Sequence, residues 1–181
     1  MTQEELNMIL DKHRKWLNDE EGGERAYLRE ANLRGADLSE TDLRRAKLCR
    51  ANLRRADLRR VNFSEADLRR ASLNEADLRR ADLCGASLNE ADLRRADLRR
   101  AKLSEAYLGG ADLCGANLDY SCWPLWCGSL DVKVDARIAR QLAYHFCRLD
   151  CDDPEYLEAR KAITEFANGF HRVDECGRIE A

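Results

Sequence analysis

Cysteine and histidine are the residues of this 181-residue chain that bind metal most readily, and most of them gather toward its C-terminus. Five of the eight cysteines and two of the three histidines follow residue 120. The candidate ligands for a tetrahedral zinc ion are Cys147, Cys151, His171 and Cys176. Their spacing differs from the CxxC pairs that are usual in zinc sites, so the sequence favours buried or free reduced thiols and no metal, with zinc as the alternative.

Covalent catalysis requires a nucleophile and a base at a suitable spacing, and the sequence contains no recognisable pair of this kind. The glycine spacing of residues 110–115 is that of a phosphate-binding loop. Ala116 and Asn117, however, stand where such a loop requires Lys and then Ser or Thr. The sequence therefore predicts a protein that is not an enzyme and that uses no cofactor.

Arginine and aspartate supply the remaining chemistry, in segments such as ADLRRADLRRAKL at residues 91–103. Leucine stands at every fifth position from Leu28 to Leu118, with Phe63 as the one exception, and alanine usually stands two residues earlier. On an α-helix a step of five residues scatters the leucines around the axis, and on a flat strand it alternates them between faces. A coil of four five-residue sides solves both problems, because residues twenty apart then stack about 4.8 Å from each other.

The repeated A(D/N)LRR segments resemble those of the pentapeptide repeat proteins, over roughly residues 26–125. This resemblance implies an all-β solenoid, a right-handed quadrilateral β-helix of about five coils. It also implies that leucine and alanine face the axis and that the polar residues face water.

Stacking at a period of twenty places one set of charges on a single face of three successive coils. Each coil contributes one aspartate and two arginines to it. This candidate binding face consists of Asp57, Asp77, Asp97, Arg59, Arg60, Arg79, Arg80, Arg99 and Arg100. The sequence favours a solvated ladder of ion pairs that keeps the rod soluble, and the alternative is a surface that binds a phosphate-bearing or acidic partner.

The two ends of the chain depart from the repeat. Thr2 and Glu5 form a capping box, and apolar positions predict an amphipathic helix over residues 3–18 within an N-terminal cap and linker of residues 1–25. Residues 126–181 are expected to form a short strand near 130–134 and a C-terminal cap of two helices, one over 136–149 and one from Pro154 to about Asn168. A solenoid end exposes apolar side chains, so both termini are expected to cover one.

The C-terminal part is also rich in aromatic residues. Trp123, Trp126, Tyr144 and Phe146 are the candidates for sealing the coil end or for a dimer interface. The protein is thus expected to be a monomer or a dimer joined through this cap.

The distribution of charge limits the possible functions. The chain carries a net charge of -3, with an excess of three positive charges in the repeat and three negative charges in each terminal part. This is far from the basic balance of a typical nucleic-acid binder. The sequence favours a scaffold or interaction module for a protein partner that remains to be identified. One alternative is direct binding of nucleic acid or another anion through the arginines. The other is modulation of DNA gyrase, because some members of the resembled family mimic DNA and bind gyrase. The absence of an apolar signal core or membrane span predicts a cytoplasmic location.

Overall fold

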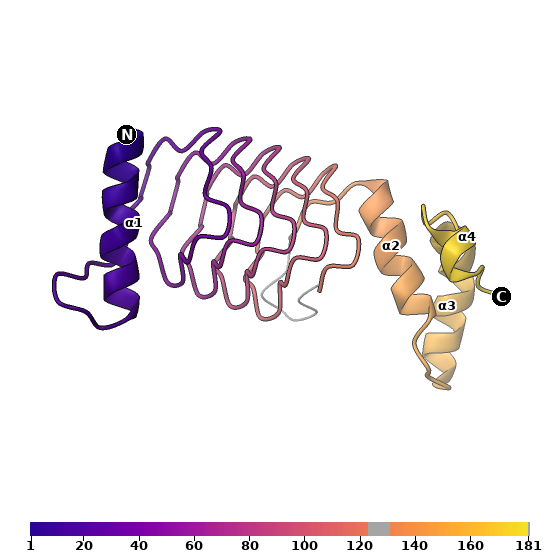
Figure 1. The fold of residues 1–181 in the computed structure, drawn as a ribbon. Helices are drawn as coiled ribbons and strands as arrows, with labels where there is room; N and C mark the ends of the chain where they lie inside the picture. The colour runs from indigo at the N-terminus through magenta and orange to yellow at the C-terminus, as the bar shows by residue number, and fades with distance from the viewer. Residues whose placement is uncertain (123–130, 181) are drawn as a thin grey trace. The chain divides into compact units, whose positions relative to one another are not determined.

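The computed structural model describes residues 1–122 and 131–180, which fall into two compact units, Met1–Lys133 and Val134–Ala181. Within these residues the helices are α1 (Gln3–Leu17), α2 (Ala136–Cys147), α3 (Pro154–Ala167) and α4 (Val173–Cys176) (Figure 1). No helix in these ranges has the length and apolar character that crossing a membrane demands.

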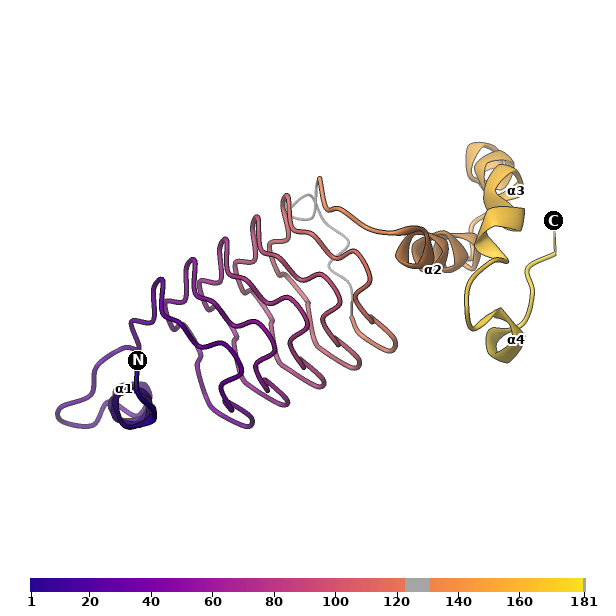
Figure 2. The ribbon, with the colours of Figure 1, turned by 90° about the horizontal axis from the view of Figure 1, so that it is seen from above.

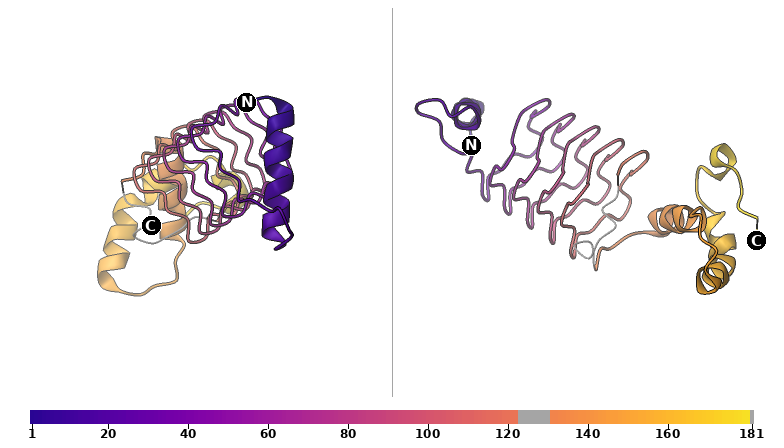
Figure 3. Two further views of the ribbon diagram at one scale, coloured as in Figure 1. Left: turned by 90° about the vertical axis from the view of Figure 1, so that its left-hand side faces the viewer. Right: turned by 90° about the horizontal axis from the view of Figure 1, so that it is seen from below.

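The first unit is built from stacked coils of twenty residues. Parallel bridges join residues twenty positions apart, from Tyr27 with Lys47 to Lys102 with Cys122, so each coil lies directly on the one before it (Figure 2). Each bridge involves a single residue, and a turn separates it from the next. Viewed from the side of α1, the coils repeat the same outline (Figure 3, left).

Every backbone N–H of a typical pentad finds an acceptor, as residues 56–60 illustrate. The N–H groups of Asp57, Leu58 and Arg60 donate to carbonyl oxygens of neighbouring coils at 2.8–3.0 Å, and that of Ala56 donates to Leu53 within the chain at 3.1 Å. The N–H of Arg59 donates to the side-chain Oδ1 of Asp57 at 3.2 Å. Aspartate or asparagine at the second position therefore closes the turn. Its side-chain oxygen accepts a hydrogen bond from a backbone N–H for which the neighbouring coils provide no acceptor.

The core of the coils is a column of leucine and alanine along the axis. The leucines from Leu38 to Leu113 and the alanines from Ala46 to Ala116 are at most 1% exposed, as are Val61 and Phe63. Burial of each leucine contributes about 1.5–3 kcal/mol, so this column is the main source of stability in the unit. The periodicity thus places the apolar residues correctly.

The fifth residue of each pentad adopts the left-handed conformation. Arg60, Arg80 and Arg100 have φ of 55°, 59° and 60°, and Gly85 and Gly115 occupy the same position elsewhere in the repeat. This conformation is unfavourable for residues with a Cβ atom. In the coil it turns the chain from one side to the next. The side chain at this position points away from the axis, and its direction is set by the left-handed backbone.

Helix α1 begins with the expected capping box. The N–H of Glu5 donates to Thr2 Oγ1 at 3.1 Å, and the N–H of Thr2 donates to Glu5 Oε2 at 2.7 Å. Further along the helix His13 is completely buried, and the N–H of Ala26, the first repeat alanine, donates to His13 Nδ1 at 3.1 Å. α1 is therefore attached to the beginning of the repeat by a buried imidazole.

The bridge to Lys133 differs from the others in register. Lys133 pairs with Asp112, a separation of twenty-one residues instead of twenty, through two backbone hydrogen bonds of 2.8 and 2.9 Å. The strand expected near 130–134 appears within the described residues as this one bridge, while Leu130 lies outside them.

The second unit consists of α2, α3 and α4, which enclose a small apolar core. Asp135 caps α2 and Asp153 caps α3, each through its carboxylate, and Pro154 occupies the first turn of α3 as the sequence predicts. α2 ends at Cys147, two residues before the expected boundary. The core residues are Tyr144, Cys147, Ala167, Phe170 and Ile179.

Candidate functional site: an arginine groove

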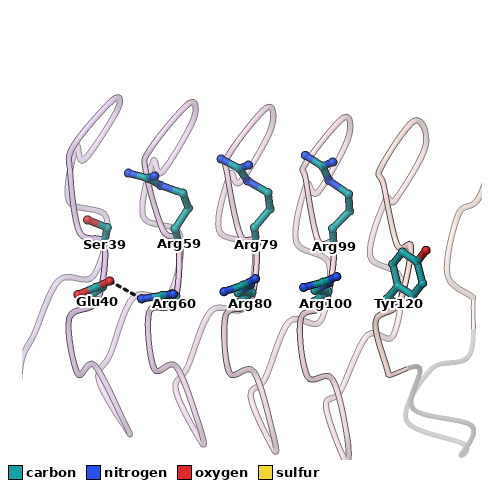
Figure 4. Close-up of a pocket in the computed structure, with 9 residues that line it drawn as sticks. All are labelled: Ser39, Glu40, Arg59, Arg60, Arg79, Arg80, Arg99, Arg100 and Tyr120. Carbon is teal, nitrogen blue, oxygen red and sulfur yellow. Dashed lines mark hydrogen bonds and ion pairs between the residues drawn. The ribbon is translucent and has the colours of Figure 1, made fainter.

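A groove of about 570 Å³ follows the face on which the sequence stacks its arginine pairs (Figure 4). Two parallel rows of side chains line it, contributed by the fourth and fifth residues of successive pentads. The lining residues are Ser39, Glu40, Arg59, Arg60, Arg79, Arg80, Arg99, Arg100 and Tyr120. The structure thus brings together all six arginines of the predicted face.

The row of fourth-position arginines is paired with aspartates of the same turn. Arg59 Nε donates to Asp57 Oδ1 at 2.7 Å, and the corresponding bonds of Arg79 to Asp77 and Arg99 to Asp97 measure 2.8 and 2.9 Å. Weaker ion pairs cross to the next coil, from Arg59 to Asp77 at 3.9 Å and from Arg79 to Asp97 at 3.7 Å. This row is the ladder of ion pairs that the sequence predicts.

The pair of Arg59 with Asp57 favours the charged form of both groups. Hydrogen bonding from the Arg59 guanidinium lowers the pKa of Asp57, with a smaller contribution from the Arg59 backbone N–H and against the opposing effect of burial. The same hydrogen bond raises the pKa of Arg59. Asp57 therefore closes its own turn and neutralises the fourth-position arginine beside it.

The row of fifth-position residues has a different composition. Glu40 pairs with Arg60 across one coil at 2.9 Å. The next two members, Arg80 and Arg100, form no ion pair with any residue in the described ranges, and the row ends at Tyr120, whose ring centroid lies 5.7 Å from the Arg100 guanidinium carbon. Six guanidiniums thus face four carboxylates in the groove, an excess of two positive charges located at Arg80 and Arg100.

Other fifth-position arginines are paired with glutamate one coil away. The observed pairs are Arg45 with Glu65, Arg50 with Glu30, Arg55 with Glu75 and Arg70 with Glu90. Arg95 lacks such a pair, but Glu75 lies one coil before it and Arg95 lowers the pKa of that carboxyl after the larger effects of Arg55. Among the described repeats, the groove is therefore the only wall on which two fifth-position arginines stacked one coil apart both lack an ion pair.

The proposed zinc ligands do not assemble. Cys147 is buried in the core of the second unit and its thiol donates to the carbonyl of Arg160, whereas Cys151 and Cys176 are exposed. His171 Nε2 lies 3.2 Å from a guanidinium nitrogen of Arg137. No three metal-binding side chains come together anywhere in residues 1–122 and 131–180. The zinc hypothesis is not supported by this geometry, because helix packing separates thiols that are close in sequence.

The aromatic residues proposed for a dimer or cap surface divide in a similar way. Trp123 and Trp126 lie outside the described residues. Tyr144 is 3% exposed, and its hydroxyl donates to the carbonyls of Cys176 and Gly177, so it belongs to the core of the second unit instead of its surface. Phe146 is 36% exposed and packs against Tyr156. Of the described pair, Phe146 is the residue that a partner can reach.

Three members of the site escaped the sequence analysis. Glu40, Ser39 and Tyr120 line the groove but do not belong to a DLRR pentad. They occupy positions twenty residues before or after the arginine pairs, so extending the stacking by one coil in each direction would have found them. The fourth-position arginines pair within their own turn and the fifth-position arginines do not, and this difference depends on side-chain direction, which the period alone does not give.

These features define a solenoid repeat protein with an apolar axis and a charged groove along one wall. The family model for pentapeptide repeats matches residues 26–64, 62–100 and 96–122, in eight copies. The chain belongs to the pentapeptide repeat family, whose members fold as right-handed quadrilateral β-helices.

Several solved structures are similar to this chain. A pentapeptide repeat protein from the cyanobacterium Cyanothece 51142 is 38% identical over 52% of this chain and 60% of its own, with a TM-score of 0.46. HetL from Nostoc sp. strain PCC 7120, which is involved in heterocyst differentiation regulation, is 34% identical over 60% of this chain and 56% of its own, with a TM-score of 0.42.

A more distant similarity is to QnrB1, a plasmid-mediated fluoroquinolone resistance protein, with 19% identity over 67% of this chain and 71% of its own and a TM-score of 0.44. No curated protein matches the chain. The chain spans less than two thirds of the length of the first two solved relatives.

Proposed function

We propose that this protein is a non-catalytic interaction module that presents the arginine groove to an anionic group on a cytoplasmic partner protein. The observation that carries the proposal is the pair Arg80 and Arg100, two guanidiniums that stack one coil apart without a carboxylate in the described residues to neutralise them. A surface made only for solubility would have no reason to differ from the other fifth-position rows, in which glutamate accompanies arginine.

In this proposal the remaining parts of the chain hold the groove in shape. The repeat that begins at Ala26 forms the right-handed quadrilateral β-helix of the family. Residues 1–25, with α1, cover its first coil. The buried contact of His13 with Ala26 supports the N-terminal part of this arrangement. A rigid solenoid suits such a role, since it keeps the guanidiniums at a fixed spacing and loses little conformational entropy on binding.

The test is a pull-down from native cytoplasm, with and without nuclease treatment, using three forms of the immobilised protein. The first is the unchanged chain, and the second carries Arg80→Gln and Arg100→Gln. The third is the matched control Arg45→Gln with Arg70→Gln, which removes the same charge from other walls. A partner that the first and third forms capture, and the second does not, supports the proposal.

Equal capture by all three forms contradicts a role for the groove. Loss of the captured material on nuclease treatment points to nucleic acid instead of a protein partner. Capture of gyrase subunits would support the alternative of gyrase modulation suggested by the family resemblance.

A further inference from the structure

We propose that the anionic group recognised by the groove is a phosphate monoester carried by a protein, bound between the guanidiniums of Arg80 and Arg100. This inference rests on the proposed function and specifies the ligand of the same site.

The spacing of the two arginines supports a single anion that both contact. Their backbones are one coil apart, which is about 4.8 Å. Their left-handed φ values of 59° and 60° give the two side chains the same exit from the wall. A phosphorus atom lies about 4 Å from the carbon of a guanidinium that binds its oxygens through two hydrogen bonds. One phosphate group placed over the groove therefore reaches both guanidiniums without moving either backbone.

An extended peptide with several carboxylates fits this spacing less well. Side chains on one face of an extended chain repeat about every 6.8 Å, so successive carboxylates fall out of step with arginines repeating at about 4.8 Å. The paired arginines add a second restriction. Arg60 is bound to Glu40 and Arg79 to Asp77, so neither is available to a second carboxylate without breaking an existing ion pair.

The charge of the groove matches a monoester. A phosphate monoester carries a charge of about -1.5 to -2 at neutral pH, and the groove has an excess of two positive charges. A long polyanion such as nucleic acid would place further phosphates against Glu40 and the three aspartates of the neighbouring row. A short, doubly charged group is accommodated without that repulsion.

Tyr120 gives the site an apolar end. Its side chain follows Arg100 in the same row and is 65% exposed, with the Arg100 guanidinium over its ring (Figure 4). A phosphorylated side chain that reaches Arg80 and Arg100 along the groove would bring the adjoining residues of its own chain against this ring. Such a contact distinguishes an ester on a protein from free phosphate.

The binding test uses phenyl phosphate as the probe and phenyl sulfate, a monoanion of similar shape, as its control. Titrations followed by the backbone amide NMR signals of the groove are made with the unchanged chain, Arg80→Gln, Arg100→Gln and the control Arg70→Gln. We expect phenyl phosphate to bind the unchanged chain and Arg70→Gln equally, and each groove variant at least tenfold more weakly. Phenyl sulfate is expected to bind more weakly than phenyl phosphate. Equal binding by all four proteins, or equal binding of the two probes, overturns the inference.

Two further arms separate this inference from the proposed function and identify the source of the phosphate. If phosphatase treatment of the cytoplasm abolishes capture by the unchanged chain, the inference gains support. If capture persists but still depends on Arg80 and Arg100, the interaction module stands and the phosphate ligand is wrong. Inorganic phosphate is titrated in parallel, and binding tenfold tighter than that of phenyl phosphate excludes a protein-borne ester as the preferred ligand.

Discussion

His13 makes the attachment of α1 to the repeat sensitive to pH. The imidazole is completely buried, and its Nδ1 accepts a hydrogen bond from the N–H of Ala26. Its Nε2 has no hydrogen-bond partner among the residues that the structure describes, and the ring stacks on Trp16 at a centroid distance of 5.5 Å. Protonation of Nδ1 would therefore eliminate the Ala26 hydrogen bond and place a charge in a buried site.

The pKa of His13 is accordingly lowered from its usual value of 6.5. Burial is the largest cause; Asp42 and the carbonyl of Arg44 oppose it, while the charges of Arg25 and Arg44 reinforce it. Because the unfolded chain then binds a proton more readily than the folded one, the free energy of unfolding decreases as the pH falls below about 6.5 and levels off below the folded pKa. The slope is at most about 1.4 kcal/mol for each pH unit.

The assay is urea unfolding between about pH 5.5 and 7.5, followed by circular dichroism, with hydrogen exchange of α1 as a local readout. The variant His13→Gln keeps an acceptor for the Ala26 N–H but does not titrate. Its free energy of unfolding is expected to be independent of pH in this range, whereas that of the unchanged chain decreases toward pH 5.5. Asp57 and Asp67, whose pKa values are lowered below 3.8 by hydrogen bonds from arginine, titrate outside the range. The same slope in both proteins would mean that protonation of His13 does not destabilise the fold.

Three other outcomes follow from the packing of the first unit. Leu78→Ala removes a completely buried side chain from the axis and is expected to cost about 2–5 kcal/mol in urea unfolding, whereas a cost below about 1 kcal/mol would contradict a close-packed axis. Arg80→Glu replaces the middle of three stacked arginines, so we expect thermal unfolding to show a free energy of unfolding about 0.5 kcal/mol higher, while binding to the groove is lost. A lower free energy of unfolding would mean that Arg80 supports the fold. Gly23→Ala brings a Cβ atom within 2.4 Å of the backbone nitrogen of Trp16, so hydrogen exchange of α1 should accelerate, and unchanged protection would show that this loop moves freely.

The architecture of the first unit could be predicted because one physical requirement dominates it. A leucine at every fifth position has no place on a helix or a flat strand, and the parallel bridges at a spacing of twenty match the square coil that this requirement implies. The capping box of α1 and the aspartate caps of α2 and α3 were predictable for a similar reason, because each depends on residues that are neighbours in sequence.

The finer properties of the groove depend on backbone conformation and could not be predicted. Asp57 and its equivalents were expected to serve in an ion-pair ladder, yet they also accept a backbone N–H and close the turn. The left-handed fifth position separates Arg60, Arg80 and Arg100 from the arginines beside them, so that one row is neutralised within its own turn and the other is not. Adjacent arginines in the sequence thus have different roles.

The second unit was harder to predict because its contacts lack a repeat. Tyr144 was grouped with the candidate aromatic residues of a cap or dimer surface because the C-terminal part is rich in them. The structure buries it against Phe170, with a ring-centroid distance of 5.0 Å. The candidate zinc ligands were grouped by proximity in sequence, whereas Cys147 at the end of α2 is buried and Cys151, which follows the helix, is exposed. Packing among the helices decides both cases.

Whether Arg80 and Arg100 together form an anion site can be seen in a crystal structure of the protein with tungstate, a phosphate analogue visible by anomalous scattering. We expect one tungstate ion between the two guanidiniums, lost in crystals of Arg80→Gln. Tungstate bound instead at the aspartate-paired arginines, or absent from the groove while occupying other sites on the protein, would contradict this expectation.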